Sequence, residues 1–280
     1  MNQAEKFKLF TALHQRPGIF VIPNPWDAGT ARILTALGFE ALATTSAGFA
    51  FSIGRRDSAA GLTREEVLAN ARAIVDATHL PVSADLEDGF GGAPETCAET
   101  IRMAAAVGLV GGSIEDATGD PDNPIFEFGL AVERVAAACE AARGLPFVVT
   151  ARAENFLHGR PHLDDTVRRL QAFAKVGADV VYAPGLPGLD DIRTVCRAVD
   201  RPVNVVMGLK GPTFSVAELQ TAGVKRVSVG GAFARAALGA FVRAAREVKE
   251  KGTFSFAADA IAGADVTAYM ANTKRNQDKP

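Results

Sequence analysis

Acidic side chains follow two short apolar stretches that are typical of neighbouring buried strands. Asp85 and Glu87 end the stretch PVSADLE, and Glu115 follows LVGGSI. Carboxylates held together in a partly buried site either raise one another's pKa or surround a cation. Oxygen ligands without His or Cys suit a hard ion, so one interpretation of the strand-end acids Asp85, Glu87, Glu115 and Asp116 is a Mg²⁺ site, with Mn²⁺ as the alternative ion.

Arginine residues offer a competing interpretation of these acids. Arg152 ends the apolar stretch FVVTAR, where its planar guanidinium is suited to bind a substrate carboxylate. Arg152, Arg55 and Arg56 would equally neutralise the acids as structural ion pairs, without any metal. The sequence leaves both interpretations open.

Small or uncharged residues end two further predicted strands. Thr45, Ser46, Ala47 and Gly48 form a turn whose backbone N–H groups could approach an anionic oxygen closely, although tight packing would also require small residues there. Asn204 ends another strand. The candidate substrate-binding residues are therefore Thr45, Ser46, Ala47, Gly48, Asp85, Arg152 and Asn204.

The elements that must position these residues alternate between short strands and longer helices. Thr63 and Glu66 form a capping-box pattern at one helix start, and Gly177 ends another helix. Such alternation gives parallel strands, and eight repeats predict a single-domain (β/α)8 TIM barrel over residues 1–252, with a doubly wound open sheet as the alternative. In a barrel the site lies at the C-terminal strand ends. The predicted strands span residues 18–23, 40–46, 80–87, 109–116, 146–154, 178–184, 202–208 and 225–231.

Residues 253–280 follow the eighth helix as a C-terminal helical extension and tail. The segment 253–272 is rich in apolar residues and must cover some surface. It either lies over its own barrel or is swapped with a partner subunit.

Composition narrows the choice of partners. The 280 residues carry a net charge of −2, which lacks the basic surface that nucleic acid requires. No stretch approaches membrane-spanning length, and the N-terminus has the pattern of an amphipathic helix rather than of a signal peptide. Cys97, Cys139 and Cys196 are odd in number and far apart, which predicts reduced thiols. We therefore expect a cytoplasmic protein with a small-molecule partner and without a nucleic acid or membrane partner.

The stretch DATGDPDNPIFE (116–127) spaces its acids somewhat like a calcium loop. It fails that pattern because Pro121 stands where the loop needs Gly. Its Gly, Pro, Asp and Asn content predicts a long, mobile lid after the fourth strand instead.

Together these motifs resemble the isocitrate lyase and phosphoenolpyruvate mutase superfamily, from about residue 7 to about residue 250. The segments that carry the resemblance are NPWDAGTARIL, TTSAGFAFSIGRRDS, DLEDGFGG, SIED and TARAENF. The resemblance implies a Mg²⁺-dependent enzyme acting on a 2-oxo or 2-hydroxy carboxylate, in a barrel that exchanges its last helix within a homodimer or homotetramer.

Matching motif positions carries roles over to single residues. The resemblance implies that Asp85 binds the metal directly, and that Glu87 and Glu115 act largely through waters. It also implies that residues 46–48 bind substrate oxygens. Asp57 is then a catalytic acid beside them, and Arg152 faces the substrate.

The lid departs from the family pattern. Residues 116–127 contain no Cys, His or Lys, whereas isocitrate and methylisocitrate lyases carry a Lys-Lys/Arg-Cys-Gly-His loop there. The mutases have a Lys-rich lid that ends in Asn-Ser, of which only Asn123 remains, followed by Pro124. Asn123 therefore joins Asp57 and Arg152 as a catalytic candidate.

What the lid lacks narrows the expected reaction. We expect a lyase that decarboxylates or cleaves a small 2-oxo dicarboxylate such as oxaloacetate through a metal-stabilised enolate. One alternative is carbon–phosphorus chemistry of the mutase or hydrolase type, acting on phosphonopyruvate. The other, from a different class, is a non-catalytic protein that binds 2-oxo acids.

Overall fold

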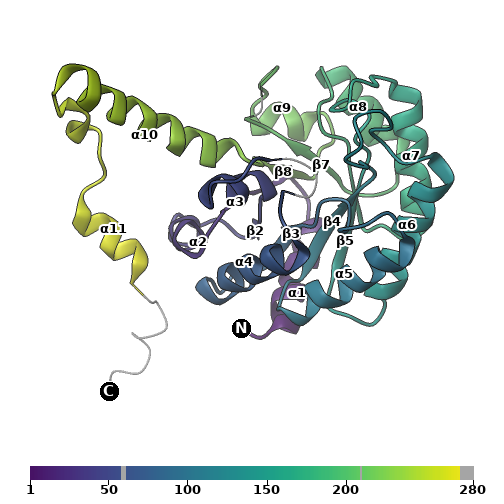
Figure 1. Cartoon of the computed structure of the whole chain (residues 1–280). Coiled ribbons are helices and arrows are strands. Elements are labelled where there is room, and N and C mark those ends of the chain that lie inside the picture. The colour runs from purple at the N-terminus through teal and green to yellow at the C-terminus, as the bar shows by residue number, and fades with distance from the viewer. Residues whose placement is uncertain (58–60, 209, 272–280) are drawn as a thin grey trace.

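The computed structural model describes residues 1–57, 61–208 and 210–271. Their eight parallel strands form one sheet in the order β1-β8-β7-β6-β5-β4-β3-β2. The backbone N–H of Ala43 donates to the carbonyl of Pro23 over 3.0 Å and joins the two ends of the sheet. The chain is therefore a nearly closed (β/α)8 barrel (Figure 1), and the open-sheet alternative is wrong. The strands are β1 (Phe20–Ile22), β2 (Leu42–Ala43), β3 (Val82–Asp85), β4 (Gly111–Glu115), β5 (Val148–Arg152), β6 (Val180–Tyr182), β7 (Val203–Val206) and β8 (Arg226–Ser228).

Each predicted strand contains one observed strand, but the paired segments are shorter. The largest difference is at β2, where the prediction over 40–46 was wrong beyond Ala43. Helix α3 (Ser46–Ser52) begins there instead, because the Oγ1 of Thr45 accepts the N–H of Gly48 over 3.3 Å. A side-chain hydroxyl that accepts a hydrogen bond from an otherwise unpaired backbone N–H stabilises the start of a helix, so the chain turns into a helix here instead of continuing the strand.

Helices surround the sheet, and α1 (Gln3–Gln15) packs against the first residues of the strands. Its Phe10 is fully buried in a cluster with Phe20, Val110 and Val148. The capping box of Thr63 and Glu66 is confirmed, with N–H···O distances of 2.9 and 3.2 Å. The remaining barrel helices are α2 (Ala28–Ala36), α4 (Arg64–Ala77), α5 (Pro94–Ala106), α6 (Phe128–Ala142), α7 (Leu163–Lys175), α8 (Leu189–Ala198) and α9 (Val216–Thr221).

The predicted lid is an ordered hairpin. Ala117 and Ile125 form an antiparallel bridge, and both side chains are buried. The two strand ends at the base of this hairpin are held by one guanidinium, because Nη1 of Arg169 donates to Oδ2 of Asp116 over 3.1 Å and to the carbonyl of Phe126 over 3.0 Å. The hairpin therefore rises from a buried, charged clamp.

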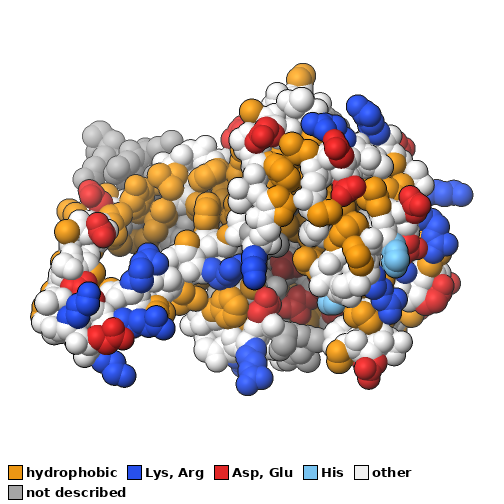
Figure 2. All heavy atoms as spheres, turned by 90° about the horizontal axis from the view of Figure 1, so that it is seen from above, with side chains coloured by type: hydrophobic (Ala, Val, Ile, Leu, Met, Phe, Trp, Pro, Cys, Tyr) orange, Lys and Arg blue, Asp and Glu red, His pale blue; other side chains and the backbone are white. Residues whose placement is uncertain are grey.

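The C-terminal arm extends away from the barrel (Figure 1). It consists of α10 (Ala232–Lys251), a 3-10 turn (Ser255–Ala258) and α11 (Gly263–Met270). Helix α11 touches α2, where Nη1 of Arg32 donates to the carbonyl of Met270 over 2.7 Å. Figure 2 shows hydrophobic side chains along this arm. Residues 272–280 of the predicted extension lie outside the described residues, and no described helix is both long and apolar enough to cross a membrane.

Candidate active site

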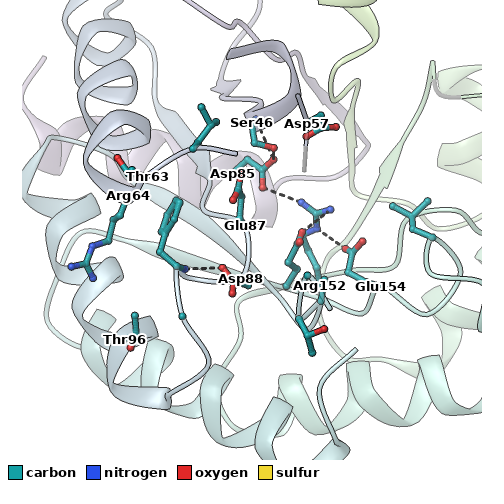
Figure 3. Close-up of a pocket in the computed structure, with 18 of the residues that line it drawn as sticks. Ser46, Asp57, Thr63, Arg64, Asp85, Glu87, Asp88, Thr96, Arg152 and Glu154 are labelled. Carbon is teal, nitrogen blue, oxygen red and sulfur yellow. Dashed lines mark hydrogen bonds and ion pairs between the residues drawn. The ribbon is translucent and has the colours of Figure 1, made fainter. Parts of the chain in front are cut away.

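A cavity of about 780 Å³ opens at the C-terminal ends of β3, β4 and β5. Seen from above, Asp and Glu side chains gather at the bottom of a hollow in the barrel face (Figure 2). The close-up in Figure 3 shows Asp85, Glu87, Arg152 and Glu154 directed toward one another in this cavity. The acids therefore lie where a barrel is expected to carry its site, at the C-terminal ends of the strands.

Arg152 is the centre of the cluster and pairs with three carboxylates. Its Nη1 lies 3.0 Å from Oδ1 of Asp85, its Nη2 3.0 Å from Oε2 of Glu115 and its Nε 2.8 Å from Oε1 of Glu154. Burial by itself would lower the pKa of Arg152, but the three carboxylates outweigh it and raise that pKa above its usual value. The ring of Tyr182 lies beneath, with its centroid 5.0 Å from Cζ.

The carboxylates outnumber the positive charge in this cavity. Burial raises the pKa of Glu115, and the neighbouring Glu154 and Asp85 raise it further against the opposing effect of Arg152. Burial and the charge of Asp85 likewise raise the pKa of Glu87 to about 8. Asp57, at the exposed rim, has a pKa raised by partial desolvation and by Asp85. One arginine therefore does not neutralise the negative charge of all the cavity carboxylates.

The loop that carries Glu87 has an unusual backbone. Glu87 and Phe90 adopt φ values of +49° and +64°, in the left-handed region that costs non-glycine residues of order 1–3 kcal/mol each. Oδ1 of Asp88 accepts the N–H of Phe90 over 2.8 Å, so Asp88 organises the turn. The fully buried Arg134 of α6 donates to the carbonyls of Asp88 and Gly91. The surrounding structure therefore holds this strained loop in place.

Of the four small residues after β2, Ser46 reaches the acids. Its Oγ donates to Oδ2 of Asp85 over 2.9 Å, and its backbone N–H faces the same oxygen at 3.4 Å. Thr45 caps α3, and Ala47 packs near Gly231. A Cβ at Gly48 would lie 2.7 Å from Cγ2 of Thr45, so close packing is a sufficient reason for that glycine.

Two candidates lie apart from the cluster. Asn204 is buried inside the barrel, where its Oδ1 accepts Nε of Arg226 over 2.8 Å and its Nδ2 donates to Oγ of Ser228 over 3.0 Å. It lines a smaller inner cavity of about 70 Å³. Asn123 is exposed on the hairpin, and its Nδ2 faces Oδ2 of Asp120 at 3.3 Å. Neither side chain reaches the main cavity in this conformation.

The structural ion-pair interpretation holds for Arg152 alone. Arg55 pairs with Glu66 at the surface over 2.6 Å, and no ion pair within the described residues joins Arg55 or Arg56 to the cavity acids. Arg134 and Tyr182 were missed from the sequence. Only the fold reveals them, because Arg134 lies between buried Ala131 and Val135 in α6 and Tyr182 pairs with Arg152 between β5 and β6.

The donor set of the cavity fits a hard divalent cation. In the part of the chain that the structure describes, no three His, Cys, Asp or Glu residues are grouped to hold an ion as they stand, since Asp85 and Glu115 point to Arg152. All the acidic donors are nevertheless oxygen atoms. Burial, and to a smaller extent the neighbouring carboxylates, raise the pKa of Glu87 and Glu115, and a cation in the cavity would oppose this effect. Asp85, Glu87 and Glu115 are the residues that would hold the ion.

A (β/α)8 barrel with an acidic cavity at its C-terminal strand ends has the layout of a barrel enzyme. The chain belongs to the isocitrate lyase/phosphoenolpyruvate mutase superfamily, because the family model described as phosphoenolpyruvate phosphomutase matches residues 10–249. The resemblance seen in the sequence motifs is thereby confirmed. This superfamily consists of lyases and mutases, which supports an enzyme.

Individual relatives agree with this membership. The crystal structure of a "putative lyase/mutase" from Burkholderia cenocepacia J2315 is 59% identical, with a TM-score of 0.94 and 97% of each chain covered. An uncharacterised protein of Mycobacterium tuberculosis is 32% identical over 86% of this chain and 89% of its own length. The 2-methylisocitrate lyase of Escherichia coli (strain K12) is 28% identical over 78% of this chain and 75% of its own.

Proposed function

We propose that this protein is a Mg²⁺-dependent carbon–carbon lyase that acts on a small 2-oxo dicarboxylate such as oxaloacetate. The observation that carries the proposal is the excess of carboxylates around Arg152 in a cavity at the catalytic end of the barrel. Membership of a superfamily of lyases and mutases supports it.

The proposed roles follow from the present contacts. Asp85, Glu87 and Glu115 would hold the cation, which when bound would supply positive charge that stabilises the enolate left by bond cleavage. Arg152 exchanges one of its carboxylate partners for a substrate carboxylate. The hydroxyl and N–H of Ser46, which now face Asp85, are then free to donate to the substrate.

Six further candidates have less direct parts in this proposal. Asp57 at the rim is placed to exchange protons with solvent. Asn123 would approach the substrate only if the hairpin tip closed over the cavity. Asn204 lines the smaller inner cavity together with Asp85 and Arg152, while Thr45, Ala47 and Gly48 shape the wall beside Ser46.

Carbon–phosphorus chemistry is the second candidate reaction. The family model that matches the chain is described as phosphoenolpyruvate phosphomutase, and this description favours carbon–phosphorus chemistry. The hairpin over the cavity carries no Lys, so a phosphoryl group would find little positive charge there. A non-catalytic 2-oxo acid binder is the third candidate.

One assay distinguishes the three. The protein is incubated with oxaloacetate, other 2-oxo acids and phosphonopyruvate, with Mg²⁺ or with EDTA, while pyruvate release and thermal shift are recorded. We expect Mg²⁺-dependent turnover of a 2-oxo diacid and its loss in Asp85→Ala. Turnover of phosphonopyruvate alone would favour the second candidate, and a thermal shift without any turnover would favour the binder.

A further inference from the structure

The proposed cleavage leaves an enolate that must receive a proton on carbon. The hairpin beside the cavity offers no donor, because residues 116–127 contain no Cys, His or Lys. The carboxylates nearest to Arg152 are occupied by that guanidinium and by their proposed task of holding the cation. Apart from the rim acid Asp57, the donor must therefore come from another part of the cavity wall.

His158 lines the same cavity as Arg152 and Glu154. Imidazole is the side chain that ordinarily exchanges a proton near neutral pH. Among the described residues that line the cavity there is no second His, and no Cys, Lys or Tyr. The imidazole of His158 forms no hydrogen bond or ion pair with any described residue, so both of its nitrogens are open to a ligand.

The backbone that carries His158 is fixed. The N–H groups of Leu157 and His158 both donate to the carbonyl of Glu154, over 3.1 and 3.2 Å. The buried Asn155 anchors the start of this turn, since its Nδ2 donates to Oδ2 of Asp165 over 2.9 Å. Gly185 packs against the outside of the turn, because a Cβ there would lie 3.0 Å from Cδ2 of Leu157. An exposed imidazole on a fixed turn is well suited to proton transfer.

We propose that His158 is the proton donor of the reaction, an inference that rests on the proposed function. When the C3–C4 bond of a 2-oxo diacid such as oxaloacetate breaks, CO₂ leaves and the electron pair remains as the enolate of pyruvate. The imidazolium N–H of His158 gives its proton to C3, which becomes the methyl group of pyruvate. The neutral imidazole then takes a proton from water.

The reverse half of this transfer isolates the role of His158. Neutral imidazole removes a methyl proton of pyruvate, exchanges it in D₂O and returns a deuteron, so the methyl signal decays in ¹H NMR without any carbon–carbon chemistry. We expect Mg²⁺-dependent exchange with the wild-type protein and a loss of about 10²-fold or more in His158→Asn. The thermal shift produced by pyruvate and Mg²⁺ should be unchanged in this variant.

His162 provides a matched control, because it is exposed on the same connection and does not line the cavity. His162→Asn should exchange pyruvate protons at the wild-type rate. If wild-type and His158→Asn proteins exchange equally, or if His158→Asn loses the thermal shift together with exchange, the donor role is overturned while the proposed function stands. If the wild-type protein shows neither exchange nor a Mg²⁺-dependent shift, and no 2-oxo diacid is turned over, the proposed function itself has failed.

Discussion

At the scale of single residues, the charge balance of the site depends on Arg152. One guanidinium serves Asp85, Glu115 and Glu154 at once, and each nitrogen that faces the cavity is used. A substrate carboxylate must therefore displace an internal partner, and the displaced acid needs a new counter-charge. Binding of the substrate and of a cation should for this reason reinforce each other.

Replacement of Arg152 by Lys tests this arrangement. Lys keeps the charge but cannot serve several carboxylates from a planar fork, so we expect pyruvate binding in the presence of Mg²⁺ to weaken by ~1–3 kcal/mol. Isothermal titration calorimetry measures the difference. Arg168→Lys is the control, because Arg168 is exposed, lies outside the cavity and has Asp165 and the ring of Phe128 as its partners among the described residues. Equal affinities of Arg152→Lys and wild type would mean that Arg152 has a purely structural role.

At the scale of elements, helix α1 closes the barrel through a neutral histidine. Nδ1 of His14 lies 2.8 Å from the carbonyl of Phe10 and so carries the proton, which leaves Nε2 to accept Nη1 of Arg226 at 3.3 Å. Burial, with the nearby charge of Arg226, lowers the pKa of His14 from 6.5 to about 3. A protonated ring would turn an N–H toward the guanidinium.

This contact predicts a defined pH dependence of stability. Between pH 6.5 and about 3 the unfolded chain binds a proton at His14 that the folded chain does not, so the contribution of His14 to the free energy of unfolding is full above pH 6.5 and falls as the pH drops. Urea unfolding of wild type and His14→Gln across this range measures it. The difference between the two proteins should shrink toward acid, and a constant difference would contradict the prediction.

The elements also show how much could be predicted from sequence. All eight strands and the acids at their ends were predictable, because apolar runs followed by carboxylates keep their order in a barrel. The start of α3 at Ser46 was not predictable, because the capping hydroxyl of Thr45 alone determines where strand gives way to helix. Contacts between distant elements, such as Arg134 on the loop of Asp88, depend on packing that no local pattern records.

At the scale of the whole molecule, the C-terminal arm leaves much apolar surface uncovered. Phe241, Phe254 and Ile261 are 69%, 65% and 57% exposed, and Ala234 is the only residue of α10 that is buried among the described ones. Contiguous apolar surface of this kind is typical of protein interfaces. We propose that the arm packs against a second copy of the chain in a homodimer or homotetramer.

Light scattering after size exclusion tests the assembly. We expect the wild-type mass to be that of a dimer or tetramer, and Phe241→Asp to lower it because a buried charge would be introduced into the interface. Lys249→Glu changes a charge on the same helix at an exposed polar position and should leave the mass unchanged. A wild-type protein that runs as a monomer at micromolar concentration would refute the proposal.

The clamp at the base of the hairpin has a consequence for protein engineering. Asp116 and Phe126 are held together by Arg169, and Oδ1 of Asp116 also accepts the N–H of Glu154 over 2.8 Å. Residues 118–124, which lie beyond the buried bridge of Ala117 and Ile125, can therefore be exchanged as a segment whose ends are already fixed. Because doubling the length of a loop costs only about 0.6 kcal/mol, longer inserts bearing Cys, His or Lys should be tolerated. The barrel thus offers a scaffold on which new substrate ranges can be selected by varying one segment.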